Sequence, residues 1–265
     1  MGIRIGNVVF DAPGPTIEEY GRSAGSIARL YAGLLDMDLL SRGDHYRSLG
    51  YPANEGDDVD PLVRSTTPGQ PDFAFEQESG TYRPPRWPDP DHPQQLHLDI
   101  VVPDLAAARQ GIIELGGTLL READGHCVLA DPVGHPLCLY AGAAGEAPRV
   151  DRIVFDCFSP RALAAFYSVL FESDAVEVDT PELVVLDAPR PGAPKLAFQH
   201  TLHQPPRWPD PAHPQQVHID LASDDPYEAA LARERALRAG AVALPYLGGG
   251  QVLADPSGHP FCVCD

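Results

Sequence analysis

The sequence PPRWPDPDHPQQLHLD occupies residues 84–99, and a nearly identical stretch, PPRWPDPAHPQQVHID, occupies residues 205–220. The two stretches differ at three pairs of positions, which are Asp91/Ala212, Leu96/Val217 and Leu98/Ile219. Further along, VLADPVGHPLC at 128–138 recurs as VLADPSGHPFC at 252–262. Repeats of this length do not arise by chance, so the protein consists of two copies of one unit.

Weaker similarities extend the repeat over the rest of the chain. One pair is strand-like and one is helix-like: VVFDA (8–12) with IVFDC (153–157), and ARLYAGLL (28–35) with AAFYSVLF (164–171). We place the first copy at residues 1–143 and the second at 147–265, joined by a short linker of small residues. The first copy carries insertions, and we expect the larger one, within the Gly-, Pro- and Asp-rich residues 42–62, to form a surface loop.

Composition narrows the class of protein. The 265 residues include 24 glycines and 29 prolines, which argues against a mostly helical bundle and predicts many short elements. With 19 basic and 38 acidic residues the net charge is −19, and such a chain repels nucleic acid and anionic membranes. There is no apolar run of about 18 residues that would span a bilayer. Five cysteines without framework spacing predict reduced thiols in a soluble, cytoplasmic protein.

Each copy divides again into two units with the same local pattern, a strand followed by a helix and then by short strands. Helix starts are indicated by Asp104 and Asp225, whose carboxylates can cap a helix, and by Ser159 followed by Pro160. The sequence therefore predicts an α+β fold built from four βαβββ modules.

The order of these motifs resembles the vicinal oxygen chelate superfamily, which includes glyoxalase I, bleomycin resistance proteins and extradiol dioxygenases. The residues that carry the resemblance are the helix text SPRALAAFYSVLF, the closing text DPSGHPFCV and the pattern RWPDP.HPQQ.H.D, which is similar to the glyoxalase-like subfamily. The resemblance covers essentially the whole chain. It implies two paired-module domains, each a curved mixed β-sheet that cups one ligand cavity.

The resemblance also implies where a metal would bind. Metal-dependent relatives take ligands from the first and last strands of paired modules. The first-strand positions fall on Asn7, His97, Arg152 and His218. The last-strand glutamate of those relatives falls on Cys138 and Cys262.

Each copy therefore offers one histidine, flanked by Asn7 in the first copy or Arg152 in the second, and by a thiol. A thiol is a poor ligand for Mg²⁺ or Mn²⁺, and Arg152 would place a fixed positive charge beside the cation. We expect no bound metal. Further donors keep one divalent metal ion open as an alternative cofactor, and these are Glu76, Gln77, Glu78, Gln199 and His200.

We expect eight residues to line the ligand cavities, namely Asn7, Trp87, His97, Cys138, Arg152, Trp208, His218 and Cys262. Two interpretations stay open for the tryptophans, a plug that holds the crossover against the sheet or an aromatic wall for a planar ligand. His97 shares a strand face with Asp99, which suits either a base or a structural histidine. The sequence places no base beside either strand cysteine, so catalytic residues stay unassigned.

The expected function is that of a small-molecule pocket protein without a catalytic metal, which binds or converts a small aromatic or anionic metabolite. Whether it is an enzyme stays open. The alternative is a divalent-metal-dependent lyase, isomerase or dioxygenase that uses one copy.

The two cavities are expected to differ in charge. Because Arg152 belongs to the second copy and Asn7 to the first, we expect the second cavity to attract the anion. We therefore expect one high-affinity site instead of two equal ones. The fused copies predict a monomer with an internal pseudo-dimer, or a dimer.

Overall fold

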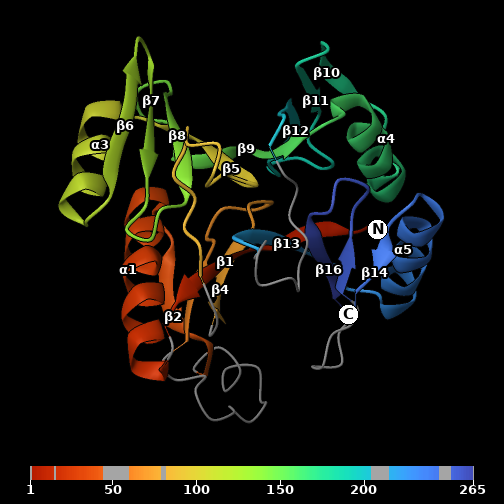
Figure 1. Ribbon diagram of the computed structural model, residues 1–265, viewed down its shortest axis with the longest axis horizontal. Helices are drawn as coiled ribbons and strands as arrows, with labels where there is room; N and C mark the ends of the chain where they lie inside the picture. The colour runs from red at the N-terminus through yellow and green to blue at the C-terminus, as the bar shows by residue number, and fades with distance from the viewer. Residues whose placement is uncertain are drawn as a thin grey trace.

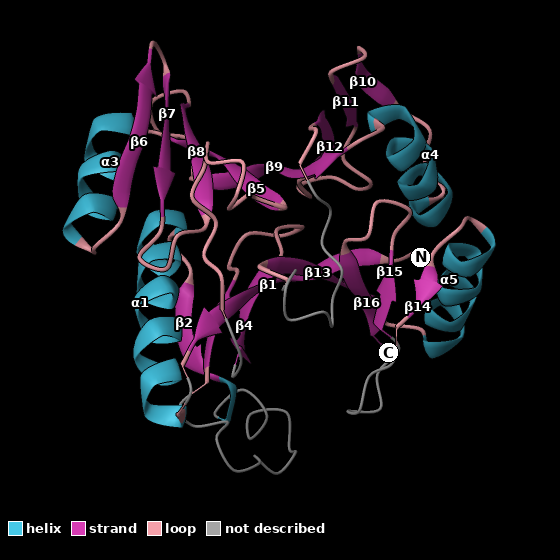
Figure 2. Cartoon of the chain, viewed as in Figure 1, coloured by secondary structure: helices cyan, strands magenta, loops and turns pink. Residues whose placement is uncertain are grey.

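The computed structural model describes residues 2–14, 16–43, 60–78, 82–203, 215–244 and 252–264. These residues form two eight-stranded mixed sheets and the helices that cover them (Figure 1, Figure 2). Sheet I has the strand order β14-β15-β16-β13-β1-β4-β3-β2, and sheet II has the order β10-β11-β12-β9-β5-β8-β7-β6.

Sheet I combines the first and the last of the four modules. The first module consists of β1 (Arg4–Pro13), α1 (Ile17–Leu35), β2 (Asp38–Ser41), β3 (Pro61–Arg64) and β4 (Asp72–Glu78). The last module consists of β13 (Val217–Ala222), α5 (Pro226–Arg238), β14 (Val242–Ala243), β15 (Val252–Ala254) and β16 (Pro260–Cys264). The two modules join where β1 pairs with β13 in antiparallel orientation.

Sheet II combines the two middle modules in the same way. The second module consists of β5 (Leu96–Val102), α3 (Leu105–Glu114), β6 (Thr118–Ala123), β7 (His126–Ala130) and β8 (Pro136–Ala141). The third consists of β9 (Arg149–Cys157), α4 (Pro160–Phe171), β10 (Val176–Asp179), β11 (Leu183–Leu186) and β12 (Lys195–His200). Here β5 pairs with β9, again antiparallel.

The expected α+β fold of four βαβββ modules in paired sheets is confirmed. Each sheet takes one module from each sequence copy, so the sheets cross the boundary between residues 1–143 and 147–265. The two sheets also meet through their helices, because α1 packs near α3 at one end of the molecule and α4 near α5 at the other (Figure 1). Each of these helix pairs belongs to a single sequence copy.

The helix starts follow the sequence in part. The Asp104 carboxylate accepts a hydrogen bond from the backbone N–H of Ala107, and the Asp225 carboxylate accepts one from Tyr227, as expected for capping residues. Ser159 precedes α4 but makes no such bond. The start of α4 is instead favoured by Pro160, whose fixed φ angle suits the first helical position.

The repeated DPxGHP turns hold the two sheets together. In the first copy the Asp131 carboxylate accepts hydrogen bonds from the backbone N–H groups of Val133 and His135, and it lies 2.8 Å from Nδ1 of His135. The His135 ring then packs edge-on against Phe10 of the other sheet, with ring centroids 5.2 Å apart. His259 packs in the same way against Phe155 at 5.3 Å. The turn histidines are therefore buried at the contact between sheets.

The glutamine pair in each HPQQ stretch lies at the centre of the molecule. The backbone N–H of Gln95 donates to Oε1 of Gln216 at 3.2 Å, and the backbone N–H of Gln216 donates to Oε1 of Gln95 at 3.1 Å. This reciprocal arrangement is that of a two-fold axis, so the repeated glutamines hold β5 and β13 against each other.

Parts of the expected organisation lie outside the described residues, namely most of the insertion at 42–62 and Trp208. Among the helices that the structure describes, none is long and apolar enough to cross a membrane.

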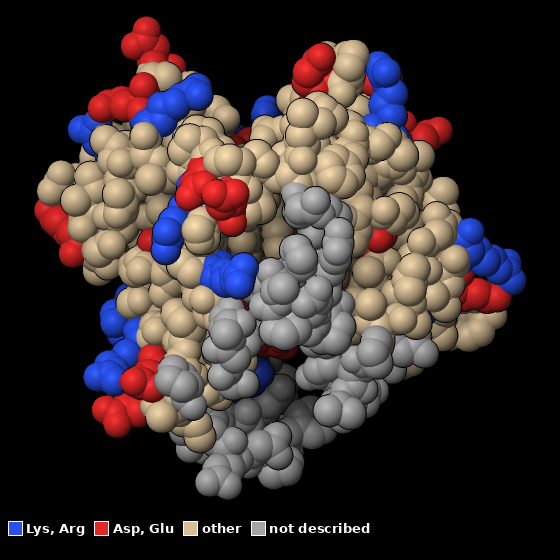
Figure 3. All heavy atoms as spheres, viewed as in Figure 1, with Lys and Arg blue, Asp and Glu red and all other residues tan. Residues whose placement is uncertain are grey.

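Figure 3 shows basic and acidic side chains together at the β6–β7 tip and at the β10–β11 tip. Ion pairs on these two modules include Arg109 with Glu122 and Lys195 with Glu177. The surplus of acidic residues therefore does not make this face uniformly negative.

Candidate ligand cavities and their electrostatics

Side chains that alternate along the central strands of each sheet share one face, which we call cup I in sheet I and cup II in sheet II. Cup I comprises Asn7, Val9, Asp11, Asp72, Ala74, Glu76, His218, Asp220 and Cys262. Cup II comprises the corresponding residues Arg152, Val154, Asp156, Lys195, Ala197, Gln199, His97, Asp99 and Cys138. The same strand register thus presents two different sets of side chains.

In cup II the carboxylate of Asp99 lies between two basic groups. Its Oδ1 is 3.6 Å from Nε2 of His97, and its Oδ2 is 3.6 Å from a guanidinium nitrogen of Arg152. On its other side, Nδ1 of His97 lies 3.2 Å from the amide nitrogen of Gln94. His97 and Asp99 are both buried, so these charges interact in a medium of low polarity.

The environment of His97 favours the imidazolium form. Burial alone would lower the pKa of His97, but the Asp99 carboxylate and the Cys138 sulfur outweigh it and raise the pKa to about 10. At neutral pH the histidine therefore carries a positive charge in the folded protein.

This charge makes stability depend on pH. Because the pKa of His97 is about 10 when folded and 6.5 in the unfolded chain, its contribution is fully present below pH 6.5 and is lost as the pH rises through about 10. We expect the free energy of unfolding to fall by on the order of 5 kcal/mol over this interval, because each unit of difference in pKa corresponds to about 1.4 kcal/mol. Urea unfolding at pH 6, 8 and 10 measures it. The His97→Gln variant should show a smaller decrease, and an equal decrease in both proteins would contradict the assignment.

The cavity of cup II has a volume of about 210 Å³. Its polar and aromatic lining residues are Trp87, Gln94, His97, Asp99, Arg121, His126, Cys138, Tyr140, Arg152 and Gln199. The ring of His126 stacks on Tyr140, with centroids 5.5 Å apart and an interplanar angle of 16°. One side of the cavity is therefore aromatic, while its basic side chains, Arg121, Arg152 and His97, outnumber the single carboxylate of Asp99.

Cup I has a histidine and an aspartate in the same arrangement, without the arginine. Nε2 of His218 is 3.6 Å from Oδ1 of Asp220, and the Asn7 amide donates a hydrogen bond to Oδ2 of Asp220 at 3.1 Å. Burial opposes the charge of His218, but Asp220, Glu76 and Asp11 raise its pKa to about 9. Burial likewise opposes ionisation of Asp220, and the His218 ring and the Asn7 amide outweigh it and lower the pKa of Asp220.

The sequence-based grouping of site residues is corrected by the sheet topology. Arg152 lies against Asp99 and His97 of the first copy, and Asn7 lies against Asp220 and His218 of the second. The sequence analysis had grouped Arg152 with His218, because both residues belong to the second copy. The reason is that β9 pairs with β5, and β1 pairs with β13.

The structure also places an imidazole beside each strand cysteine, which the sequence did not reveal. The side-chain donor atoms of His97, Asp99 and Cys138 lie within 4.8 Å of one another, as do those of His218, Asp220 and Cys262. Contact with the Cys264 thiol, followed by burial, raises the pKa of Cys262 far above its usual range. Cys262 is therefore a neutral thiol at physiological pH.

Comparison with known proteins agrees with the fold. A family model for the glyoxalase-like domain matches the chain twice, over residues 22–140 and 152–264. The chain belongs to the glyoxalase-like domain family. This family is part of the vicinal oxygen chelate superfamily, as the sequence resemblance implied. Among curated proteins, no sequence matches the chain.

Solved structures resemble this glyoxalase-like protein over nearly its full length. Glyoxalase I from Zea mays has 13% sequence identity and a TM-score of 0.62, covering 98% of this chain and 92% of that one. A putative dioxygenase from Bacillus subtilis has 13% identity and a TM-score of 0.59, covering 97% of this chain and 83% of that one. At such low identity the likeness concerns the fold alone.

The donor set of this glyoxalase-like chain does not fit a hard metal at the positions that the family resemblance implies. The last strands of the four modules are β4, β8, β12 and β16. At the same position of the strand register, β4 has Ala74 and β12 has Ala197, whereas β8 has Cys138 and β16 has Cys262. No last-strand position therefore supplies a carboxylate. In cup II the Arg152 guanidinium, 3.6 Å from Asp99, adds a fixed positive charge that opposes a cation.

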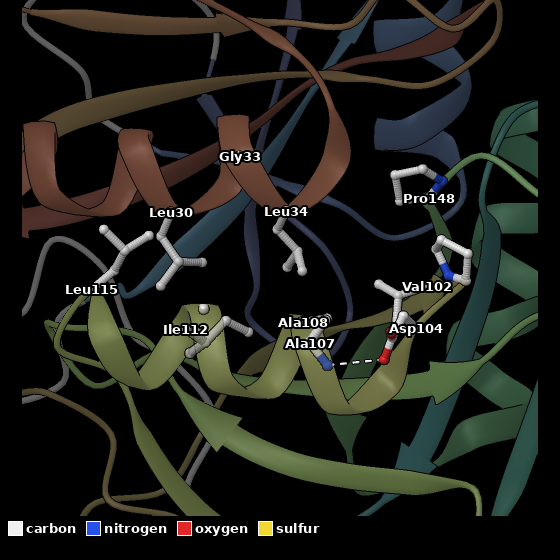
Figure 4. Close-up of a pocket in the computed structure, with 12 residues that line it drawn as sticks. Leu30, Gly33, Leu34, Val102, Asp104, Ala107, Ala108, Ile112, Leu115 and Pro148 are labelled. Atoms are coloured by element: carbon white, nitrogen blue, oxygen red, sulfur yellow. Dashed lines mark hydrogen bonds between the residues drawn. The ribbon is translucent and has the colours of Figure 1, made fainter.

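A larger cavity of about 460 Å³ lies between α1 and α3. Figure 4 shows Leu30 and Leu34 of α1 facing Ala108 and Ile112 of α3 across it. Its single carboxylate, Asp104, is used as the cap of α3. With an apolar lining and no free ionisable group among its lining residues, this hollow offers no chemistry comparable to that of the cups.

Four of the residues that the sequence analysis expected to line a cavity do line the cavity of cup II, namely Trp87, His97, Cys138 and Arg152. Trp87 lines cup II and is half-buried, so it is available as an aromatic wall. Arg121, His126 and Tyr140 were missed because they lie on β6, β7 and β8 outside the long repeat. The Gln94 amide was also missed, although its recurrence as Gln215 was a visible signal.

Proposed function

We propose that cup II binds a small planar anion without a metal, for sequestration or for metal-independent chemistry. The observation that carries the proposal is Arg152, a permanent cation that lies in the cavity beside His97 and Asp99. Guanidinium groups pair with carboxylates in a planar, bidentate geometry. A carboxylate ligand can therefore bind where a divalent cation is disfavoured.

The charge balance of the cavity supports an anionic ligand. Among the residues that line the cavity, Arg121, Arg152 and the protonated His97 face one carboxylate, that of Asp99. Asp156 shares this sheet face without lining the cavity, and burial raises its pKa. Arg152 also pairs with Asp151 at 3.5 Å. An anion brings this cluster closer to neutrality in a partly buried place where unpaired charge is costly. Cup I lacks Arg152 and carries Glu76, so we expect one such site per chain.

Size and shape narrow the ligand class. The cavity of about 210 Å³ is below the range of about 300–1,000 Å³ typical of sites for drug-sized ligands. Trp87 and the stacked His126–Tyr140 pair offer flat apolar faces, which favour an aromatic ring. A single-ring aromatic carboxylate combines the expected size, shape and charge.

Titration calorimetry with benzoate and with its neutral analogue benzamide tests the proposal on chelator-treated protein. We expect benzoate to bind once per chain and more tightly than benzamide. Arg152→Gln should weaken benzoate binding by about 10- to 100-fold, the usual effect of losing a charge-assisted hydrogen bond. His97→Ala should weaken it as well, whereas His218→Ala in cup I should not.

The outcomes separate this function from its alternatives. Equal affinity for benzoate and benzamide, or an unchanged affinity in Arg152→Gln, would contradict an anion site. A lowered melting temperature of His97→Ala with unchanged affinity would make His97 structural. Binding that requires an added divalent cation would favour the second candidate, a metal-dependent lyase, isomerase or dioxygenase.

A further inference from the structure

A row of paired residues on the cup II face of sheet II links two arginines. From β6 to β9 the row consists of Arg121, Val128, Cys138, Asp99 and Arg152. Residues that pair directly point to the same side of a sheet. Neighbouring strands lie about 4.8 Å apart, so four strand spacings separate the two arginines, on the order of 19 Å along the sheet. Both arginines nevertheless line one cavity, so they reach it from opposite sides.

Arg121 faces this cavity because of a β-bulge between β6 and β7. Leu119 pairs with Leu129, but the next pair is Arg121 with Val128, so that Leu120 is passed over. In a regular ladder Leu120 would lie opposite Val128 and would occupy the cup face. Bulges of this kind redirect a side chain, and they are common beside functional sites.

The equivalent ladder of sheet I, between β14 and β15, keeps a regular register through its described residues. There the backbone N–H of Leu244 donates to the carbonyl oxygen of Val252 at 2.9 Å. Leu244 is the counterpart of Leu120 in the repeated sequence. A leucine therefore holds the place that the bulge gives to Arg121 in cup II, and the difference arises from the bulge.

Both arginines have N–H groups that the protein does not use. The side chain of Arg121 has no ion-pair or hydrogen-bond partner among the described residues. Arg152 lies near Asp99 and Asp151, yet its buried Nε makes no hydrogen bond within the described part of the chain. Each guanidinium group can therefore donate to an acidic group of a ligand.

An aromatic surface lies on the strands between the two arginines. His126 on β7 pairs with Tyr140 on β8, and their rings stack with an interplanar angle of 16°. In the sheet, β6 lies on one side of these strands, and β5 and β9 lie on the other. A ligand ring that packs on this flat pair therefore has one arginine toward each end. In cup I the counterpart of Tyr140 is Cys264, which offers no such surface.

We propose that cup II selects an aromatic dianion with acidic groups at opposite ends of its ring, one bound by Arg152 and the other by Arg121. This inference rests on the anion site proposed above and adds Arg121 as the residue that determines specificity for the second acidic group. A benzene ring with carboxylates at positions 1 and 4 has this chemistry, because guanidinium groups pair with planar carboxylates. It keeps the single ring that a cavity of about 210 Å³ favours.

Titration calorimetry of the full-length protein with terephthalate and with its monoamide, 4-carbamoylbenzoate, tests the second acidic group. The two compounds differ in one charge and hardly in size. We expect terephthalate to bind at least 10-fold more tightly, because the amide group of the other compound offers Arg121 no charge. Phthalate, whose two carboxylates are adjacent on the ring, should bind more weakly than terephthalate.

Variants assign the preference to one residue. Arg121→Gln should reduce the preference for terephthalate over its monoamide to less than 2-fold, whereas Arg152→Gln should weaken the binding of both compounds. The matched control is Arg161→Gln, which removes an arginine that is paired with Asp179 at 2.6 Å and lies outside the cavity lining. This control should keep the full preference. Circular dichroism and melting curves confirm that each variant is folded.

Benzoate separates a failure of this inference from a failure of the anion site. Wild-type protein that binds benzoate but prefers terephthalate over the monoamide by less than 2-fold overturns the role of Arg121. So does a folded Arg121→Gln variant that keeps the preference. In both cases the anion site at Arg152 still stands. No binding of either benzoate or terephthalate contradicts the anion site itself, and the dianion with it.

Discussion

Fragments 1–143 and 147–265, produced separately, are expected not to fold as stable monomers, whereas together they should form a 1:1 complex. Each fragment contains half of sheet I and half of sheet II, because β1 pairs with β13 and β5 pairs with β9. An isolated fragment would expose the central edge strands of both half-sheets, and such edges aggregate or pair with a second copy. The expected effect is the loss of the native monomeric fold.

Size-exclusion chromatography with light scattering and circular dichroism on each fragment, alone and mixed, measures this. The matched control is the intact chain with a protease site placed between residues 143 and 147. After cleavage it should stay associated and keep its melting temperature, because the linker residues are mostly exposed. Two separately stable, monomeric fragments would show that the pairing between copies is dispensable.

Phe10→Ala is expected to lower the free energy of unfolding by about 3–5 kcal/mol. Phe10 is 1% exposed and its ring packs against Tyr31, Phe73, Phe75 and His135, with centroid distances of 4.8 to 5.9 Å. The truncation leaves a cavity at the contact between sheet I and the β7–β8 turn of sheet II. Few neighbours can close it, because the surrounding rings are rigid.

Chemical denaturation of Phe10→Ala and of Phe158→Ala gives the comparison. Phe158 is 50% exposed, so its truncation should change stability by no more than about 0.5 kcal/mol. Phe155→Ala, at the equivalent place of the other copy, should resemble Phe10→Ala. A loss below about 1 kcal/mol for Phe10→Ala would mean that the contact between the sheets contributes little.

The sequence was sufficient to predict the fold, because the motifs that indicate the fold are local and occur twice in the chain. The motifs around Trp87 and Trp208 established the duplication, and the caps Asp104 and Asp225 located two helix starts. The presence of His97 and His218 on strand faces with an aspartate two residues further followed from the alternation of strand side chains. These features depend on spacing along one segment, which a sequence displays directly.

What only the tertiary structure decided is which modules pair, and therefore which side chains share a cup. The sequence does not specify whether β5 adds to β1 or to β9, because both pairings satisfy the same hydrophobic pattern. The observed pairing brings Arg152 to Asp99 and Asn7 to Asp220, and it gathers Asp11, Glu76 and His218 from strands far apart in the chain. Strand pairing over such separations is governed by the packing of whole faces, here the Phe10–His135 and Phe155–His259 contacts and the Gln95–Gln216 bonds. The charge of each cup is thus a property of the assembled sheets, whereas the existence of two cups is already determined by the repeated sequence.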